Sequence, residues 1–242
     1  MYEMIEIQFE DTSFPVYHSK PDGADMPGLI IIHEVWGLTD HIKDVADRFA
    51  KEGYDVLAPD LLSHTGITEK IDQNIMREIM NPETRSEAQK KMRAAMTPLQ
   101  EPGFAEETVA KLMLCVTRLL ATSRTVGVVG YCFGGTYAFS LAASDNRLKA
   151  AVPYYGHAPE DPDKIKQITC PVLAFYGEKD TGLMGGLEDL KQMMAKYSKD
   201  FTPVVYPDAG HAFFNDTNPV TYNAKVARNA WQKTTTFLSK NL

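Results

Sequence analysis

A cysteine between glycines occupies the most chemically suggestive position of this sequence. Gly130 and Gly134 flank Cys132 in the segment GYCFGG, which follows the apolar run TVGVV and precedes a helix-like segment. This is the G-x-S-x-G spacing of a tight strand-to-helix turn, with cysteine in place of serine. Glycines avoid clashes at such a turn, and the start of a helix favours a thiolate. By itself the motif fits a nucleophile and a small buried cysteine equally well.

Two more side chains complete the pattern of a catalytic triad. Asp180 follows the run VLAFYGEK and His211 follows VVYPDAG, so each comes after a segment that is typical of a strand. The chain order nucleophile, acid, histidine is that of hydrolases with a nucleophile elbow. His211 would take the proton of the Cys132 thiol, and Asp180 would orient the imidazole and stabilise its cation. Together the three residues favour the catalytic interpretation of Cys132.

The other histidines and glycines indicate neither a metal nor a dinucleotide cofactor. His33 and Glu34 resemble the start of a zinc-binding HExxH motif, but Gly37 stands where the second histidine is needed. The glycines of residues 127–135 do not form G-x-G-x-x-G. No cofactor is therefore expected. The remaining histidines are predicted to be surface or loop residues: His18, His41, His64 and His157.

The elements that must position these residues alternate along the chain. Short β-branched runs are separated by longer amphipathic segments, which predicts a mostly parallel sheet covered on both faces. Ligands of such sheets gather at the carboxyl ends of the strands. Predicted strands occupy residues 4–9, 14–19, 28–34, 54–60, 125–131, 148–156, 170–180 and 201–210. Predicted helices occupy residues 39–54, 105–122, 132–144, 186–199 and 221–240.

One segment, residues 61–103, is too long for an ordinary connection between a strand and a helix. Isoleucines recur every four residues from Ile67 to Ile79, which predicts a helix that Pro82 interrupts. A second helix is predicted to carry Met92 and Met96. We expect a helical insertion over one end of the sheet, with its Ile and Met side chains packed onto the domain.

Composition limits the function classes. The 242 residues suit a single domain, 1–242, and the formal net charge of −7 argues against nucleic-acid binding. No apolar run is long enough for a membrane span, and the N-terminus does not have the pattern of a signal peptide. Three cysteines cannot form a disulfide framework. We therefore expect a cytoplasmic monomer or homodimer that acts on a small molecule.

Five short motifs resemble those of the dienelactone hydrolases, also called carboxymethylenebutenolidases. They are EVWGL (34–38), PDL (59–61), GYCFGG (130–135), GEKD (177–180) and GHAF (210–213). The resemblance covers essentially the whole chain, and a glutamate after the third strand combined with a cysteine elbow is specific to this family among α/β-hydrolases. It implies an α/β-hydrolase fold, with a mostly parallel central sheet, helices on both faces and a short helical insertion. It also implies that Cys132, Asp180 and His211 form the triad.

The resemblance implies further roles at the same site. Glu34 would lie beside the thiol and control its ionisation, and the backbone N–H groups of Val35 and Phe133 would form the oxyanion hole. Electrostatics support the role of Glu34 only in part, because a carboxylate opposes a neighbouring thiolate. A structural hydrogen bond at the end of the strand is the alternative for Glu34.

Substrate contacts are predicted from the same resemblance and from nearby aromatic residues. The family holds a substrate carboxylate with arginines, and Arg85 matches the first of these, although a solvated helix charge is equally consistent. Asn215 stands where the second arginine usually occurs and cannot replace its charge. This departure favours neutral esters or lactones. The residues expected to contact substrate are Trp36, Arg85, Tyr155 and Phe213.

The sequence thus predicts a carboxylic ester or lactone hydrolase that works through an acyl-enzyme on Cys132. A hydrolase for thioesters or promiscuous activated esters is an alternative within enzymes. A catalytically silent protein that binds a small molecule in the same pocket is an alternative of another class.

Overall fold

Strands of the computed structural model form one sheet with a mostly parallel core. The structure describes residues 1–242 except 22, 24, 72 and 73. Within the described residues the strands of the sheet lie in the order β1-β2-β4-β3-β5-β6-β7-β8. Strand β2 pairs antiparallel with both β1 and β4, and all other neighbouring strands are parallel. The bounds are β1 (Tyr2–Phe9), β2 (Thr12–Ser19), β3 (Gly28–Ile32), β4 (Asp55–Pro59), β5 (Val126–Tyr131), β6 (Ala150–Tyr154), β7 (Val172–Gly177) and β8 (Phe201–Tyr206).

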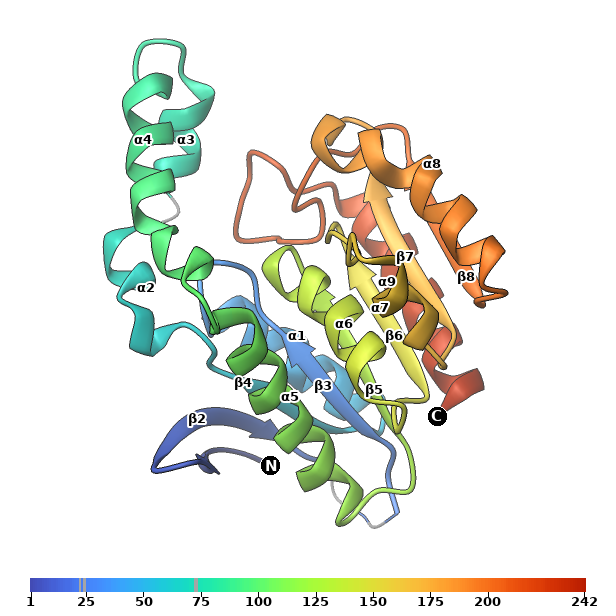
Figure 1. Ribbon diagram of the computed structural model, residues 1–242. Helices are drawn as coiled ribbons and strands as arrows, with labels where there is room; N and C mark the ends of the chain where they lie inside the picture. The colour runs from blue at the N-terminus through green and yellow to red at the C-terminus, as the bar shows by residue number, and fades with distance from the viewer. Residues whose placement is uncertain (22, 24, 72–73) are drawn as a thin grey trace.

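Helices cover both faces of this sheet (Figure 1). One face carries α5 (Phe104–Leu120), α6 (Phe133–Ser144), α7 (Pro162–Gln167) and α8 (Thr181–Lys196), and the other carries α1 (Asp40–Lys51) and α9 (Ala224–Asn241). Every residue of β3 to β7 is buried, as expected for strands covered on both faces. The predicted α/β architecture is confirmed. None of the described helices is long and apolar enough to span a bilayer.

The segment between β4 and α5 is helical, but not as one long helix. It contains η1 (Ser63–Thr65), α2 (Ile67–Lys70), α3 (Asn74–Met80), α4 (Arg85–Ala95) and η2 (Thr97–Gln100), and α3 and α4 project beyond the rest of the molecule in Figure 1. The prediction of one helix from Ile67 to Ile79 is wrong, because Ile71 adopts an extended backbone that ends α2; residues 72 and 73 of that prediction lie outside the described residues. Ile67 and Ile71 are nevertheless buried, as the packing interpretation requires.

Several element ends differ from the predictions around the catalytic edge. Helix α8 begins at Thr181, five residues before the predicted start at 186, and strand β7 ends at Gly177 rather than at Asp180. Helix α7 was not predicted; Asp161 caps it by accepting a hydrogen bond from the backbone N–H of Asp163 at 2.9 Å. The parallel strands β5, β6, β7 and β8 bring the segments that follow them to one edge of the sheet, and these segments contain Cys132, Tyr155, Asp180 and His211.

Candidate active site

Cys132 occupies a strained turn between β5 and α6. Its backbone has φ 57° and ψ −112°, a conformation that L-residues rarely adopt. The turn is possible only because its neighbours are glycines: a Cβ on Gly130 would lie 1.9 Å from the carbonyl oxygen of Gly134. A Cβ on Gly134 would lie 2.2 Å from the carbonyl oxygen of Ile32. The predicted elbow is therefore present, with the cysteine at its apex and partly exposed.

His211 and Asp180 form a hydrogen-bonded pair at the same edge. Asp180 follows β7, and His211 follows β8; the Nδ1 atom of His211 lies 2.6 Å from Oδ2 of Asp180. This contact leaves the Nε2 side of the ring for another partner. The imidazole is 42% exposed and the Asp180 side chain 15% exposed, so the ring is open to solvent while its carboxylate partner is largely covered.

Charge at this edge favours a protonated imidazole. Partial burial lowers the pKa of His211, but the neighbouring Cys132 and the bond to Asp180 outweigh it and hold this pKa well above its ordinary value. Burial keeps the two other thiols in their neutral form, because it raises the pKa of Cys115 and raises that of Cys170 to about 11. Both of these cysteines lie in the apolar core.

Glu34 is a buried carboxylate at the end of β3. It is 2% exposed, accepts a short hydrogen bond from the side-chain amide of Asn215, and accepts a second from the hydroxyl of Tyr155 at 3.4 Å. Burial raises the pKa of Glu34, against the opposing effects of His41, Asn215, His211 and Tyr155. A carboxyl group in this environment holds its proton to higher pH than a solvated one does.

His33 fixes the loop that carries Glu34 and Val35 against the elbow. Its Nε2 accepts the backbone N–H of Leu61 at 3.0 Å, so Nδ1 carries the proton and donates to the carbonyl oxygen of Glu34 at 2.6 Å. The backbone N–H of Gly134 donates to the carbonyl oxygen of His33 at 3.0 Å. The segments of Val35 and Phe133 are thereby held side by side, as two oxyanion donors require.

Several residues around this edge of the sheet have a strained backbone with positive φ. Six described non-glycine residues have positive φ, and three of them lie at or next to the elbow, the end of β6 and His211: Cys132 (57°), Tyr155 (37°) and Ala212 (59°). The other three, Glu10, Asp25 and Ser198, lie in turns or bends elsewhere in the chain. Such conformations persist only where the surrounding structure over-determines them, and they cluster at functional sites. The concentration of three such residues here therefore agrees with a functional edge.

One histidine prediction was wrong. His41 is not a surface residue: it is 4% exposed, its Nδ1 lies 2.9 Å from Oδ1 of Asp216, and its buried Nε2 has no hydrogen-bond partner among the described residues. Asp216 follows Asn215 directly, so one loop contacts both Glu34 and His41. No local sequence pattern indicates this pairing, because 175 residues separate His41 from Asp216.

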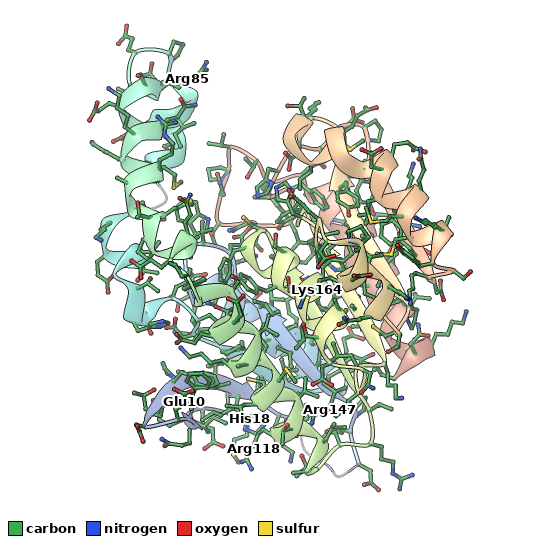
Figure 2. The ribbon with its side chains drawn as sticks, in the orientation of Figure 1. Glu10, His18, Arg85, Arg118, Arg147 and Lys164 are labelled. Atoms are coloured by element: carbon green, nitrogen blue, oxygen red, sulfur yellow. The ribbon has the colours of Figure 1, made fainter. Side chains whose placement is uncertain are left out.

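The expected substrate contacts are not all brought to the site. Arg85 lies at the far end of the α3–α4 projection (Figure 2), where its Nε donates to the carbonyl oxygen of Ile79 at 3.0 Å. Phe213 is fully buried and Tyr155 is 1% exposed, so neither side chain is accessible to a ligand in this structure. Trp36 is only partly buried. Asn215 stands where the second arginine of the family usually occurs. In this structure its side-chain amide donates a hydrogen bond to Glu34.

No group of three or more histidine, cysteine or acidic side chains in the described part of the chain could hold a metal ion. His33 in particular has both ring nitrogens committed to backbone groups. The residues at the edge are those of covalent and acid–base chemistry: a thiol, an imidazole–carboxylate pair and a buried carboxyl group.

Comparison with known proteins decides the family. The model of the dienelactone hydrolase family matches residues 14–242. The chain belongs to the dienelactone hydrolase family. A candidate carboxymethylenebutenolidase of Saccharolobus solfataricus is 34% identical over 230 residues, which cover 88% of each chain. Another, of Methylorubrum extorquens, is 30% identical over 242 residues, covering 95% of this chain and 77% of that one.

Solved structures agree with this family assignment. The crystal structure of a candidate dienelactone hydrolase from Klebsiella pneumoniae superposes with a TM-score of 0.82 at 25% identity, covering 99% of this chain and 98% of the other. The fold is thus that of the α/β-hydrolases, and the family consists of hydrolases that act on ester bonds. As a member of the dienelactone hydrolase family, this protein is an ester or lactone hydrolase.

Proposed function

We propose that the protein hydrolyses carboxylic esters or lactones through an acyl-enzyme on Cys132. The observation that carries this proposal is the His211–Asp180 pair, 2.6 Å apart, at the same sheet edge as a cysteine in a strained elbow. A thiol nucleophile needs a base oriented by a third group, and this arrangement supplies both.

In the first half of the reaction, His211 removes the Sγ proton of Cys132. The sulfur attacks the carbonyl carbon, an S–C bond forms, and the π electrons move to the carbonyl oxygen. The C–O bond to the alcohol then breaks, and the imidazolium returns its proton to the departing oxygen. With a lactone, the departing hydroxyl stays attached to the acyl group.

In the second half, His211 removes a proton from water, which attacks the carbonyl carbon of the thioester. The S–C bond breaks, the carboxylic acid leaves, and the thiol regains a proton from His211. The backbone N–H groups of Val35 and Phe133 stabilise the oxyanion in both halves. Asp180 stabilises the imidazolium each time it forms.

Glu34 regulates the ionisation of Cys132 in this proposal. Its carboxyl group is buried, and burial raises its pKa, so it keeps a proton to higher pH than a solvated carboxyl group does. Glu34→Gln removes a negative charge near the thiol. Alkylation by iodoacetamide should then proceed at lower pH than in the wild type, and an unchanged alkylation profile would leave Glu34 with a structural role.

The deciding experiment compares cysteine variants with p-nitrophenyl acetate as substrate. Cys132→Ala should abolish turnover, whereas the buried controls Cys115→Ala and Cys170→Ala should retain it if they fold. Mass spectrometry after brief reaction and acid quench should find an acetyl group on the peptide that contains Cys132. Turnover that survives in Cys132→Ala would contradict the proposal, and binding without any turnover in the wild type would favour the silent binding protein.

A further inference from the structure

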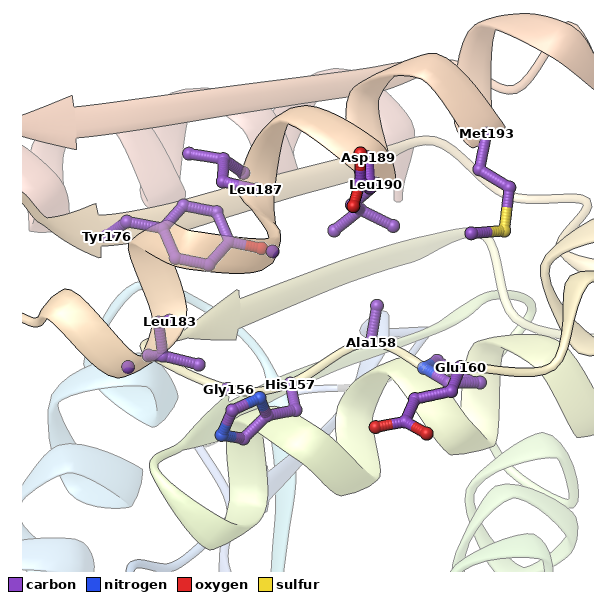
Figure 3. A pocket seen from close by; sticks show the side chains of 13 residues that line it. Gly156, His157, Ala158, Glu160, Tyr176, Leu183, Leu187, Asp189, Leu190 and Met193 are labelled. Atoms are coloured by element: carbon purple, nitrogen blue, oxygen red, sulfur yellow. The ribbon is translucent and has the colours of Figure 1, made fainter.

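A cavity outside the triad lies against helix α8. It has a volume of about 280 Å³ and is bounded on one side by the loop 156–160 after β6 and on the other by α8 (Figure 3). The loop begins directly after Tyr155, which contacts Glu34, and α8 begins directly after Asp180. The cavity is therefore built by the two segments that also hold the catalytic edge, and its size is near the lower end of small-molecule pockets.

A buried hydroxyl group without a partner marks this cavity. Tyr176 lines it and is 2% exposed, and its hydroxyl oxygen has no hydrogen-bond partner among the described residues. In Figure 3 the ring extends from β7 and directs its hydroxyl end toward the α8 side chains Asp189 and Leu190. Burial raises the pKa of Tyr176, so the group remains an O–H that can donate. A buried polar group of this kind is costly unless something in the cavity bonds to it.

The first two turns of helix α8 carry glycines, which have no side chain, at positions that face the cavity. Gly182 and Gly186, one helical turn apart, both line the cavity, and a Cβ placed on Gly186 would meet nothing within 4 Å. Glycine inside a helix is less favourable than alanine, and here no close backbone contact requires it. The apolar side chains of α8 that line the cavity are Leu183, Leu187, Leu190 and Met193.

The charges at the cavity select against anions. Glu160 and Asp189 line it, and none of the described residues that line it is a lysine or an arginine. Its remaining polar groups are His157 and the Tyr176 hydroxyl. An anionic chain would face two carboxylates without a cation, whereas a neutral apolar chain would cover the leucines.

We propose that this cavity binds the apolar chain of a neutral ester, and that Tyr176 donates a hydrogen bond to an oxygen carried on that chain. The assignment rests on the proposed esterase function and adds a substrate class to it: neutral esters with a medium-length chain. The chain could belong to the acyl group or to the alcohol, which share the same chemistry.

Two leucine variants of α8 test the cavity. Gly186→Leu fills it, and Gly185→Leu is the matched control, because Gly185 does not line the cavity and its Cβ also meets nothing. The measured quantity is the ratio of kcat/KM for p-nitrophenyl hexanoate to that for the acetate. Gly186→Leu should lower this ratio about tenfold, since several methylene groups lose their buried site. Gly185→Leu should leave it unchanged.

A second series identifies which part of the ester enters. For the wild type and both leucine variants, kcat/KM for hexyl acetate is divided by kcat/KM for ethyl acetate, each measured by titration of the released acid. A loss confined to the p-nitrophenyl esters assigns the acyl chain, and a loss confined to the alkyl acetates assigns the alcohol. A loss in neither series would overturn the cavity assignment. Acetate turnover by the wild type measures the proposed function itself, so its absence would overturn both proposals together.

Tyr176→Phe tests the hydrogen bond with a ketone carried on the chain. The wild type should prefer p-nitrophenyl 5-oxohexanoate to the hexanoate by about threefold to tenfold, the usual range for one net hydrogen bond. Tyr176→Phe should remove this preference while it still hydrolyses the hexanoate. Equal preference in wild type and variant would show that the hydroxyl does not bind the chain.

Discussion

Asn215 donates a hydrogen bond from its side-chain amide to the buried carboxylate of Glu34, across 181 residues of sequence. The amide cannot turn around, because its oxygen already accepts from the backbone N–H of Thr217 at 3.0 Å and from the Thr217 hydroxyl at 2.7 Å. The loop after His211 therefore presents a fixed donor to the carboxyl group beside the elbow.

Asn215→Asp keeps the shape and the acceptor for Thr217 but replaces the donor with a second carboxylate. The free energy of unfolding should fall by about 3 kcal/mol or more at neutral pH, because two buried carboxylates then face each other. The loss should grow as pH rises, since the folded state holds a proton that the unfolded chain releases. Urea denaturation at about pH 5 and about pH 8 measures this.

Asn218→Asp is the control for this variant. Asn218 is also buried and on the same loop, but its Oδ1 accepts the backbone N–H of Val220 and it does not contact Glu34. Equal pH dependence in the two variants would contradict the role assigned to Asn215.

Glu34→Gln should change how stability depends on pH. Burial raises the folded-state pKa of Glu34, so the folded protein binds more protons than the unfolded chain above the ordinary value of 4.5. Stability from this group is present below that value and is lost as pH rises through the folded pKa. The variant should therefore gain on the wild type as pH increases, whereas the exposed control Glu188→Gln should follow the wild type in urea denaturation.

Asp180→Asn should cost about a thousandfold or more in kcat/KM for p-nitrophenyl acetate, because the imidazole loses its orienting carboxylate. His211→Ala should cost as much, and the double variant little more, since the pair acts as one unit. Asp208→Asn, an exposed position near His211, is the matched control. Losses that multiply in the double variant would mean that the two residues act independently.

Arg85→Ala should change kcat/KM for the anionic substrate dienelactone by less than about twofold, relative to a neutral ester. The guanidinium bonds to Ile79 within the α3–α4 projection and contributes at most a screened, distant charge. Neutral esters should accordingly be hydrolysed at least as well as dienelactone by the wild type. A selective tenfold loss with dienelactone would mean that the projection moves during catalysis and brings Arg85 to the substrate.

The sequence predicted the architecture well where local patterns determine structure. Runs such as GLIII and VGVVGY predict buried parallel strands, and the structure has them at β3 and β5. The start of α8 was missed because Gly182, Gly185 and Gly186 disfavour helix in isolation, and contacts with β7 and β8 override that preference. The insertion was predicted as helical, but its break at Ile71 has no local sequence signal.

At the site, the residues that lie next to recognisable turns were predictable. Cys132, Asp180 and His211 each follow a strand, and parallel strands bring such positions together. The contacts of Asn215 and His41 were not predictable, because each depends on a loop that returns from far along the chain. Phe213 and Tyr155 were expected to face substrate, but an aromatic residue near a motif packs into the core equally well.

The adjacency of His33 and Glu34 has a consequence for proton balance. Burial lowers the pKa of His33 from its ordinary 6.5 and raises that of Glu34 from 4.5. Folding therefore favours the neutral form of both side chains, the deprotonated imidazole and the protonated carboxyl group. The two shifts change the number of bound protons in opposite directions, so the effect of one residue on the pH dependence of stability offsets part of the effect of the other.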